Sequence, residues 1–188
     1  MVKKLGRVIA IISISIASII LIGGIVASLI DSDRANNTVI VGGNRIEIIE
    51  DFSPPERLEP GVEFKKDVSV TNVGLSDCYV RIKAVFTDSD MEKYCIVDWN
   101  TDDFEYNADD NFYYYKKELK QNETTESLFT TVSIKTTYDS DGDGTDEAIS
   151  VDEMKDFDIL VYAESYQSRG FSNYTEAWKH YRRNKPID

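Results

Sequence analysis

Beyond residue 30, apolar and polar side chains alternate at every second position in several short segments, whereas the three- or four-residue spacing of an amphipathic helix is scarce. Because successive side chains of a strand point to opposite faces of a sheet, this alternation predicts strands with one buried face. The predicted strands cover residues 38–41, 45–50, 64–71, 78–87, 94–99, 111–116, 128–136 and 158–166. The clearest is 78–87, in which Cys78, Val80 and Ile82 share one face.

Turn signals separate these segments. Gly42-Gly43-Asn44 is typical of a short hairpin turn, and Pro54-Pro55 and Pro60-Gly61 interrupt the chain because proline cannot donate to a strand ladder. Roughly eight strands separated by such turns predict an all-β fold, a two-sheet sandwich of jelly-roll or immunoglobulin-like type that occupies residues 31–188 as a single domain. Alternation carries no information on strand order, so both topologies stay open.

One helix and two loops complete the predicted domain. A short C-terminal helix is expected over residues 173–183, with Asn173 as its N-cap and Glu176 at the reciprocal position of a capping box. Residues 88–93 and 137–153 are predicted to be loops, and the second of them is unusually acidic.

The first thirty residues have a different character. Three basic residues, the last of them Arg7, precede a run from residue 8 to residue 30 that carries no charge. Such a run is typical of a secretory signal peptide, for which Val26-Ala27-Ser28 offers small residues for cleavage, and it is also long enough to be a membrane anchor helix. Under either alternative the basic end stays in the cytoplasm. We therefore expect residues 1–30 to direct the domain to a secreted or cell-surface location.

The charge of the chain narrows the range of partners. The formal net charge is −13, and because the leader carries only positive charge, the predicted domain is more acidic still. An acidic surface repels the phosphates of DNA and RNA and attracts cations or basic proteins. We therefore expect no nucleic-acid partner.

An acidic segment in the second predicted loop is the sharpest local motif. Asp139, Asp141, Asp143 and Asp146 are interleaved with two glycines. This spacing lets one tight loop surround a hard cation with oxygen ligands, as in the calcium loops of extracellular repeats. An EF-hand would require an acidic residue at the twelfth position, where Ser150 stands instead. The motif predicts a weak Ca²⁺ site, and the alternative is a solvated acidic turn.

The two cysteines and the single histidine give little support for catalysis. Cys78 and Cys95 lie in predicted strands, where they either form one disulfide in an oxidising compartment or remain free thiols, and both alternatives stay open. His180 is the only histidine, so the two-histidine zinc face of a His-Glu-x-x-His helix cannot be built. We expect the protein not to be an enzyme.

The aromatic run Phe112-Tyr113-Tyr114-Tyr115 has two interpretations. Its amphipathic rings suit stacking on carbohydrate. In an alternating strand, however, half of the rings should fill the core, and core packing is the interpretation that we prefer.

The order of several segments resembles the TasA/camelysin family, the exported matrix proteins of Gram-positive bacteria that a SipW-type signal peptidase processes. The segments are the uncharged leader, Asn37-Thr38-Val39-Ile40-Val41-Gly42, Pro60-Gly61, Lys66-Asp67-Val68-Ser69-Val70-Thr71-Asn72-Val73-Gly74, Cys78-Tyr79-Val80-Arg81-Ile82-Lys83, Tyr113-Tyr114-Tyr115-Lys116, Leu128-Phe129 and residues 163–178. The likeness extends over most of the chain beyond the leader. The acidic loop and the cysteine pair depart from the family pattern.

This resemblance implies a jelly-roll domain on the cell surface or in a biofilm matrix. It implies self-association or association with other matrix proteins, in fibres whose subunits donate an N-terminal strand to a neighbour. Residues 31–41 would be that strand once the leader is cut. The alternative is a monomeric, adhesin-like surface module that residues 8–30 hold in the membrane. The camelysin branch also implies a metallo-endopeptidase, which the single histidine disfavours.

Overall fold

The structure is a computed structural model that describes residues 38–41 and 44–184. The predicted leader, residues 1–30, lies outside the described residues, as does the choice between signal peptide and membrane anchor. Among the residues that are described, no helix combines the length and the apolar character needed to cross a membrane.

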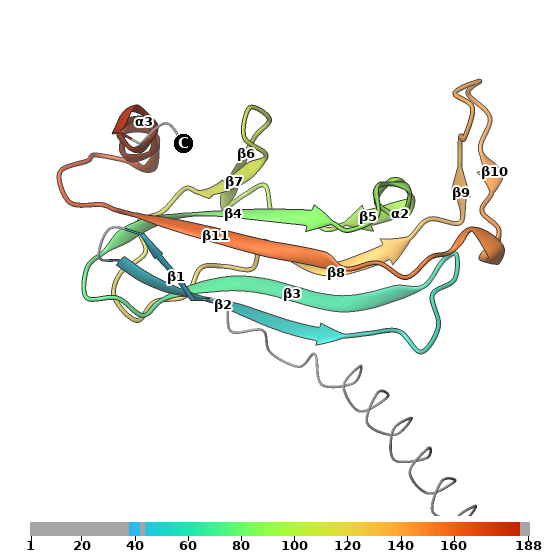
Figure 1. Ribbon diagram of the computed structural model, residues 1–188, viewed down its shortest axis with the longest axis horizontal. Coiled ribbons are helices and arrows are strands. Elements are labelled where there is room, and N and C mark those ends of the chain that lie inside the picture. Colours follow the sequence, from blue (N-terminus) through green and yellow to red (C-terminus); the bar gives the residue numbers. More distant parts are fainter. Residues whose placement is uncertain (1–37, 42–43, 185–188) are drawn as a thin grey trace, which may run out of the picture. The chain divides into compact units, whose positions relative to one another are not determined.

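Antiparallel strands dominate the described part of the chain, where one sheet has five strands in the order β1-β2-β3-β8-β5 and another has four in the order β11-β4-β7-β6 (Figure 1). The strands of the first sheet are β1 (Thr38–Val41), β2 (Asn44–Ser53), β3 (Glu63–Asn72), β8 (Phe129–Ile134) and β5 (Cys95–Val97). Those of the second are β11 (Ile159–Gln167), β4 (Cys78–Phe86), β7 (Phe112–Tyr115) and β6 (Phe104–Asn107). Every predicted strand overlaps one of these, so the all-β prediction is confirmed.

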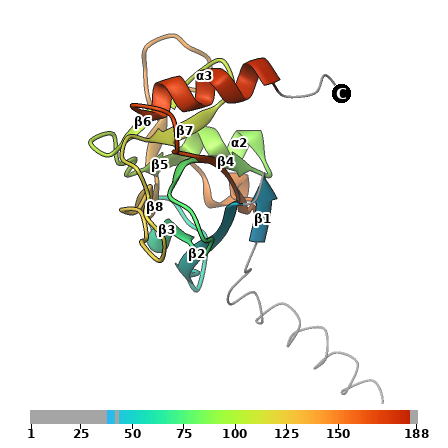
Figure 2. The same cartoon turned by 90° about the vertical axis from the view of Figure 1, so that its left-hand side faces the viewer.

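The core lies between the two main sheets, which form separate layers (Figures 1 and 2). Ile48 and Val70 of the five-stranded sheet and Ile82 and Val161 of the four-stranded sheet belong to one buried apolar cluster. Their positions follow the period-two pattern, because alternate residues of each strand face the opposite sheet. The sandwich therefore rests on the same alternation that is visible in the sequence.

A lysine interrupts the apolar face of β3. The side chain of Lys66 points inward with Phe64 and Val68 and is only 4% exposed. Its ammonium group donates to the carboxylate of Glu50 on the neighbouring strand β2 at 2.7 Å. Since a buried charge is tolerated only when it is paired, this ion pair allows a lysine on the inner face of the sheet.

The turn from β3 to β4 is organised by Asn72, whose side chain is fully buried. Its amide nitrogen donates to the carbonyl oxygens of Ser76 and Leu119 at 2.9 and 3.1 Å, and its amide oxygen accepts from the N–H of Gly74 at 3.0 Å. A β-carbon at position 74 would lie 2.9 Å from the backbone nitrogen of Arg45, so a glycine is required there. The Asn72-Val73-Gly74 turn is thus a buried junction between a strand of one main sheet and a strand of the other.

Two elements outside the acidic loop differ from the prediction. Residues 88–93 were expected to be a loop, but Ser89–Tyr94 forms helix α2, because the Asp88 carboxylate accepts from the N–H groups of Asp90 and Met91 and Met91 is buried beneath the helix. Strand β6 was not predicted, because of its four residues only Phe104 is buried and the alternation is too short to recognise.

The second predicted loop also contains regular structure. Its residues include the hairpin strands β9 (Thr137–Tyr138) and β10 (Glu147–Ala148) and the short 3-10 helix η1 (Val151–Glu153). In Figure 1 the β9–β10 hairpin projects from one end of the two main sheets. The acidic motif occupies the tip of this hairpin.

The predicted C-terminal helix is present as α3 (Tyr174–Asn184). Asn173 caps it, as expected, by accepting from the N–H of Glu176 at 3.0 Å, but the Glu176 carboxylate accepts from Ser172 rather than from the cap residue. The helix covers the outer face of the four-stranded sheet (Figure 2), where Trp178 joins a second buried cluster with Tyr79 and Tyr114.

Candidate functional site

The tip of the β9–β10 hairpin brings three of the four predicted calcium ligands together. One carboxylate oxygen each from Asp139, Asp141 and Asp143 lies within 4.8 Å of the others. Asp146, the fourth predicted ligand, is not part of this group, and its carboxylate accepts from the hydroxyl of Thr137 at 3.3 Å. Three clustered carboxylate oxygens are a donor set that suits Ca²⁺.

Local hydrogen bonds orient these carboxylates. Asp139 accepts from the N–H groups of Gly142 and Gly144 at 2.7 and 2.9 Å, and Asp143 accepts from the N–H of Thr145 at 2.7 Å. Both glycines have positive φ angles, 77° and 88°, so the loop can fold back on itself without steric strain. The arrangement explains why the Asp and Gly positions must be interleaved. That the loop binds calcium stays a prediction.

The cysteines are free thiols in the structure, Cys78 on β4 and Cys95 on β5, and these two strands belong to different sheets. Of the two alternatives, the structure thus contains the free thiols and not the disulfide. Burial raises the pKa of each thiol to about 12. Because the thiolate is the reactive form, neither residue is suited to act as a nucleophile near neutral pH.

His180 lies on α3, where its Nδ1 is 2.9 Å from the hydroxyl of Tyr166 on β11. The ring also lies beside those of Tyr166 and Phe171. These contacts fit a role in attaching the helix to the sheet.

An ion cluster that the sequence did not reveal lies under the helix. Arg81 is 5% exposed, and its guanidinium donates to Glu164 (Nε, 2.8 Å), Asp110 (2.9 Å) and the hydroxyl of Tyr114 (2.8 Å). Burial acts to lower the pKa of Arg81, but the hydrogen bond to Glu164 helps to raise it above its ordinary value. The period-two alternation of residues 78–87 puts Arg81 on the face opposite to Val80 and Ile82, and the structure agrees. What alternation cannot show is that α3 covers this face.

The aromatic run 112–115 forms strand β7, and its side chains divide between the two faces of the four-stranded sheet. Tyr115 is buried in the sandwich core, whereas Tyr114 is buried in the cluster under α3. Phe112 and Tyr113 are half-buried, with Phe112 under the Arg81 guanidinium at 4.1 Å and Tyr113 stacked on Trp99. Packing therefore accounts for most of the run, in agreement with the preferred interpretation.

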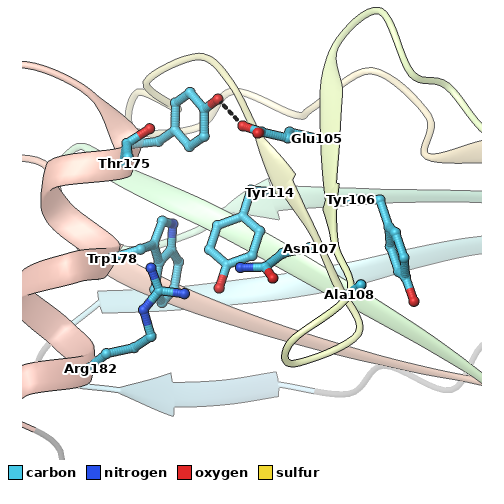
Figure 3. A pocket seen from close by; sticks show the side chains of 9 residues that line it. Glu105, Tyr106, Asn107, Ala108, Tyr114, Thr175, Trp178 and Arg182 are labelled. Atoms are coloured by element: carbon cyan, nitrogen blue, oxygen red, sulfur yellow. Dashed lines mark hydrogen bonds between the residues drawn. The ribbon is translucent and has the colours of Figure 1, made fainter.

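A pocket of about 250 Å³ opens between α3 and the β6–β7 hairpin (Figure 3). Its walls combine aromatic rings with polar side chains: Glu105, Tyr106, Asn107, Ala108, Tyr114, Tyr174, Thr175, Trp178 and Arg182. The hydroxyl of Tyr174 donates to the Glu105 carboxylate and so connects helix α3 to strand β6. No sequence motif marks this pocket, because its walls come from two segments about seventy residues apart.

Comparison of the chain with known protein families, with curated proteins and with solved structures found no match. The resemblance to the TasA/camelysin family therefore stays a prediction.

Proposed function

We propose that the protein is an exported, surface-displayed structural protein whose jelly-roll domain assembles with copies of itself by strand donation. The proposal rests on one observation above all. Strand β1 is an edge strand of the five-stranded sheet, and it follows within ten residues of the uncharged leader. The expected cleavage would thus free the segment that immediately precedes an exchangeable strand.

The geometry of β1 suits exchange. It pairs with β2 alone in the described residues, from Thr38 opposite Glu47 to Val41 opposite Asn44. A four-residue edge pairing is a small part of the sheet, and its loss would expose unpaired N–H and C=O groups along β2. The same segment of a second copy could satisfy those groups, which is β-augmentation between identical chains. Repetition of this head-to-tail contact builds a fibre.

An alternative keeps the leader in place. If residues 8–30 remain in the membrane as an anchor, each copy is tethered and acts as a monomeric surface module for another matrix or surface protein. In both cases the protein is not an enzyme. The half-buried or buried thiols and the single histidine, which is in contact with Tyr166, support that view.

Calcium binding at the hairpin tip is the second part of the proposal. The clustered oxygens of Asp139, Asp141 and Asp143 support it. The expected dissociation constant is about 10⁻⁴–10⁻³ M, the range of extracellular calcium modules. A bound ion would offset the repulsion among these carboxylates and stiffen the hairpin.

The experiment that tests assembly uses the protein beginning at residue 31. Negative-stain microscopy and sedimentation over a wide concentration range should show fibres. A synthetic peptide of residues 31–41 should shorten them by occupying the β2 edge, whereas a scrambled peptide of the same composition should have no effect. Monodisperse particles at every concentration would contradict the fibre proposal. N-terminal sequencing of the protein recovered from its source would then decide for the anchored module if it begins at Met1.

A further inference from the structure

The outer face of the four-stranded sheet is only partly covered. Helix α3 packs over it near the C-terminal end of β11, where Tyr166 joins the cluster around Trp178. Further along the same two strands, Leu160 and Tyr162 of β11 and Val85 of β4 also point outward and are 40%, 50% and 36% exposed. Leu160 and Val85 are register partners, so these side chains form one apolar patch. Contiguous exposed apolar side chains are typical of an interaction site.

Two charged elements flank this patch. In Figure 1, α3 lies at one end of the four-stranded sheet and the β9–β10 hairpin at the other, and the hairpin rises on the side that α3 covers, as it also does in Figure 2. The chain order agrees, because β11 begins shortly after the hairpin and ends shortly before the helix. Helix, apolar patch and hairpin therefore follow one another along a single face.

The hairpin end of this face is strongly negative. Residues 136–154 include seven acidic side chains and no basic one. The seven are Asp139, Asp141, Asp143, Asp146, Glu147, Asp152 and Glu153. None of them forms an ion pair with a residue that the structure describes. Their hydrogen bonds to backbone groups leave the negative charge without a counter-charge.

The helix end carries the opposite charge. Lys179 and Arg183 are exposed and lie four residues apart on α3, so they share one face of the helix. Neither forms an ion pair within the described part of the chain. Glu176, one turn earlier, bonds to the N–H of Ser172, and residues 177–184 include no acidic residue. The last two turns of α3 are therefore a positive surface on an acidic protein.

We infer that this face binds a second copy of the chain across a two-fold axis. In that dimer the α3 of each copy lies against the acidic hairpin of the other, and the two apolar patches meet near the axis. A face that is basic at one end, apolar in the middle and acidic at the other end is complementary to itself after rotation by a half turn. Because the chain is strongly acidic overall, a contact between two copies needs such a local pairing of opposite charges.

The two charged elements cannot pair within one copy. The nine residues of β11 that separate them span about 27 Å, which exceeds the Debye length of about 10 Å at 0.1 M salt. A second copy brings them into contact twice, once at each end of the patch. This dimer uses the outer face of the four-stranded sheet, whereas strand donation would use β1 and β2 of the other main sheet. The inference is therefore independent of fibre assembly.

Charge reversal at each end of the face tests the contact. The full chain is used in a neutral, density-matched detergent without calcium, because its uncut leader keeps strand donation out of the measurement. Sedimentation equilibrium should show a dimer. Lys179→Glu/Arg183→Glu and Asp146→Lys/Glu147→Lys should each raise its dissociation constant at least about tenfold, since each substitution acts at two symmetric contacts. Both variants keep the three clustered carboxylates of the predicted calcium site.

An equimolar mixture of these two variants should restore the dimer. The reversed helix of one then meets the reversed hairpin of the other, so both contacts are attractive again. The control Arg45→Glu/Arg57→Glu makes an equal charge change at exposed positions on β2 and just after it, and it should leave the dissociation constant unchanged. Far-UV circular dichroism and thermal unfolding confirm that each variant is folded.

A chemical cross-link gives a second measurement of the charged contact. Carbodiimide joins a lysine amine directly to a carboxylate. In a mixture of isotope-labelled and unlabelled wild-type chain, mass spectrometry should find Lys179 of one copy linked to residues 139–153 of the other.

The apolar patch is tested by a matched pair of substitutions. Leu160→Ser and Ile49→Ser each replace an outward side chain that is 40% exposed, the first in the patch and the second on β2 of the other main sheet. Leu160→Ser should raise the dissociation constant of the dimer about tenfold, because it removes apolar surface that the partner covers. Ile49→Ser should leave it unchanged.

Several results would overturn the inference. A wild-type chain that is monomeric at every concentration lacks the contact, and growth beyond two copies would mean a head-to-tail contact that does not close. A dimer that neither charge reversal weakens, or that the mixture does not restore, forms elsewhere, as association through the leader would. Equal weakening by Leu160→Ser and Ile49→Ser would exclude the patch from the interface.

Discussion

In the sandwich interior, side chains from strands far apart in the sequence pack together. In the β9–β10 hairpin, by contrast, the acidic side chains bond to backbone groups no more than seven residues away. Ile48 and Ile82 are 1% and 0% exposed and come from opposite sheets. Asp139 and Asp143 are held by Gly142, Gly144 and Thr145 at the exposed tip. The interior thus determines whether the chain folds, whereas the exposed hairpin tip can respond to ions in the solution.

The contrast is largest for truncation of an interior side chain. Ile82→Ala should lower the free energy of unfolding by about 2–5 kcal/mol, because it removes buried apolar surface and leaves a cavity in close-packed surroundings. Ile96→Ala, at a position that is 55% exposed on β5, should lower it by less than about 1 kcal/mol. Urea unfolding of both variants provides the measurement. Equal losses would mean that the interior is not packed as described.

The next largest loss in the free energy of unfolding is expected at Asn72, a polar residue of the interior. Asn72→Ala removes one acceptor and two donors. The buried N–H of Gly74 loses its side-chain acceptor, whereas the carbonyl of Leu119 still accepts from the N–H of Cys78. The expected loss is about 2–3 kcal/mol, because unsatisfied buried groups keep their full desolvation penalty. Urea unfolding again measures it, with the neighbouring Thr71→Ala as control. A loss below about 1 kcal/mol would show that water replaces the Asn72 side-chain amide and therefore reaches the β3–β4 junction.

A carboxylate of the sandwich allows a direct comparison with those of the hairpin. Asp98, just after β5, accepts from the N–H groups of Thr130 and Thr131, each at 2.8 Å, and from both hydroxyls. Burial acts to raise the pKa of Asp98, but these hydrogen bonds outweigh it and hold the pKa below its ordinary value. Unlike the hairpin carboxylates, Asp98 bonds to residues more than thirty positions away.

The lowered pKa of Asp98 fixes how its contribution to stability changes with pH. A carboxyl group whose pKa is lower in the folded state stabilises that state above its unfolded pKa of about 3.9, and the contribution is lost as the pH falls through the folded pKa. Asp98→Asn should therefore lower stability by roughly 1.5 kcal/mol at pH 7. The difference from wild type should shrink below about pH 4. Urea unfolding at pH 7 and pH 3 measures it, and Asp109→Asn, an exposed aspartate, should differ from wild type at neither pH.

The distinction between long-range and local contacts also explains which elements the sequence could predict. Strands such as β3 and β4 are long enough for period-two alternation to be recognised, and the acidic motif is visible because its ligands are neighbours in the sequence. Strand β6 and helix α2 were missed because each buries a single side chain, Phe104 or Met91. The α3 pocket was missed because its walls meet only after the chain has folded.

Calcium is expected to have the smallest effect on stability, and this effect is the most specific to the hairpin. At ten times the dissociation constant, a ligand that binds only the folded state stabilises it by about 1.4 kcal/mol. Calorimetric titration should show weak binding to the wild type, and thermal unfolding in about 10 mM CaCl₂ should show the corresponding rise in Tm. Asp141→Ala/Asp143→Ala should abolish both, because it removes two of the three clustered carboxylates.

The matched control removes the same amount of charge elsewhere. Asp109 and Asp156 are exposed and lie outside the hairpin, so Asp109→Ala/Asp156→Ala should bind calcium and gain stability as the wild type does. If the control pair loses the response equally, calcium acts by screening the acidic surface as a whole rather than at a site. If the wild type gives no heat, the hairpin tip is a solvated turn. In either case the interior and the hairpin would differ only in how much they contribute to the free energy of unfolding. Only calcium binding at a specific site would make the hairpin respond to the ion.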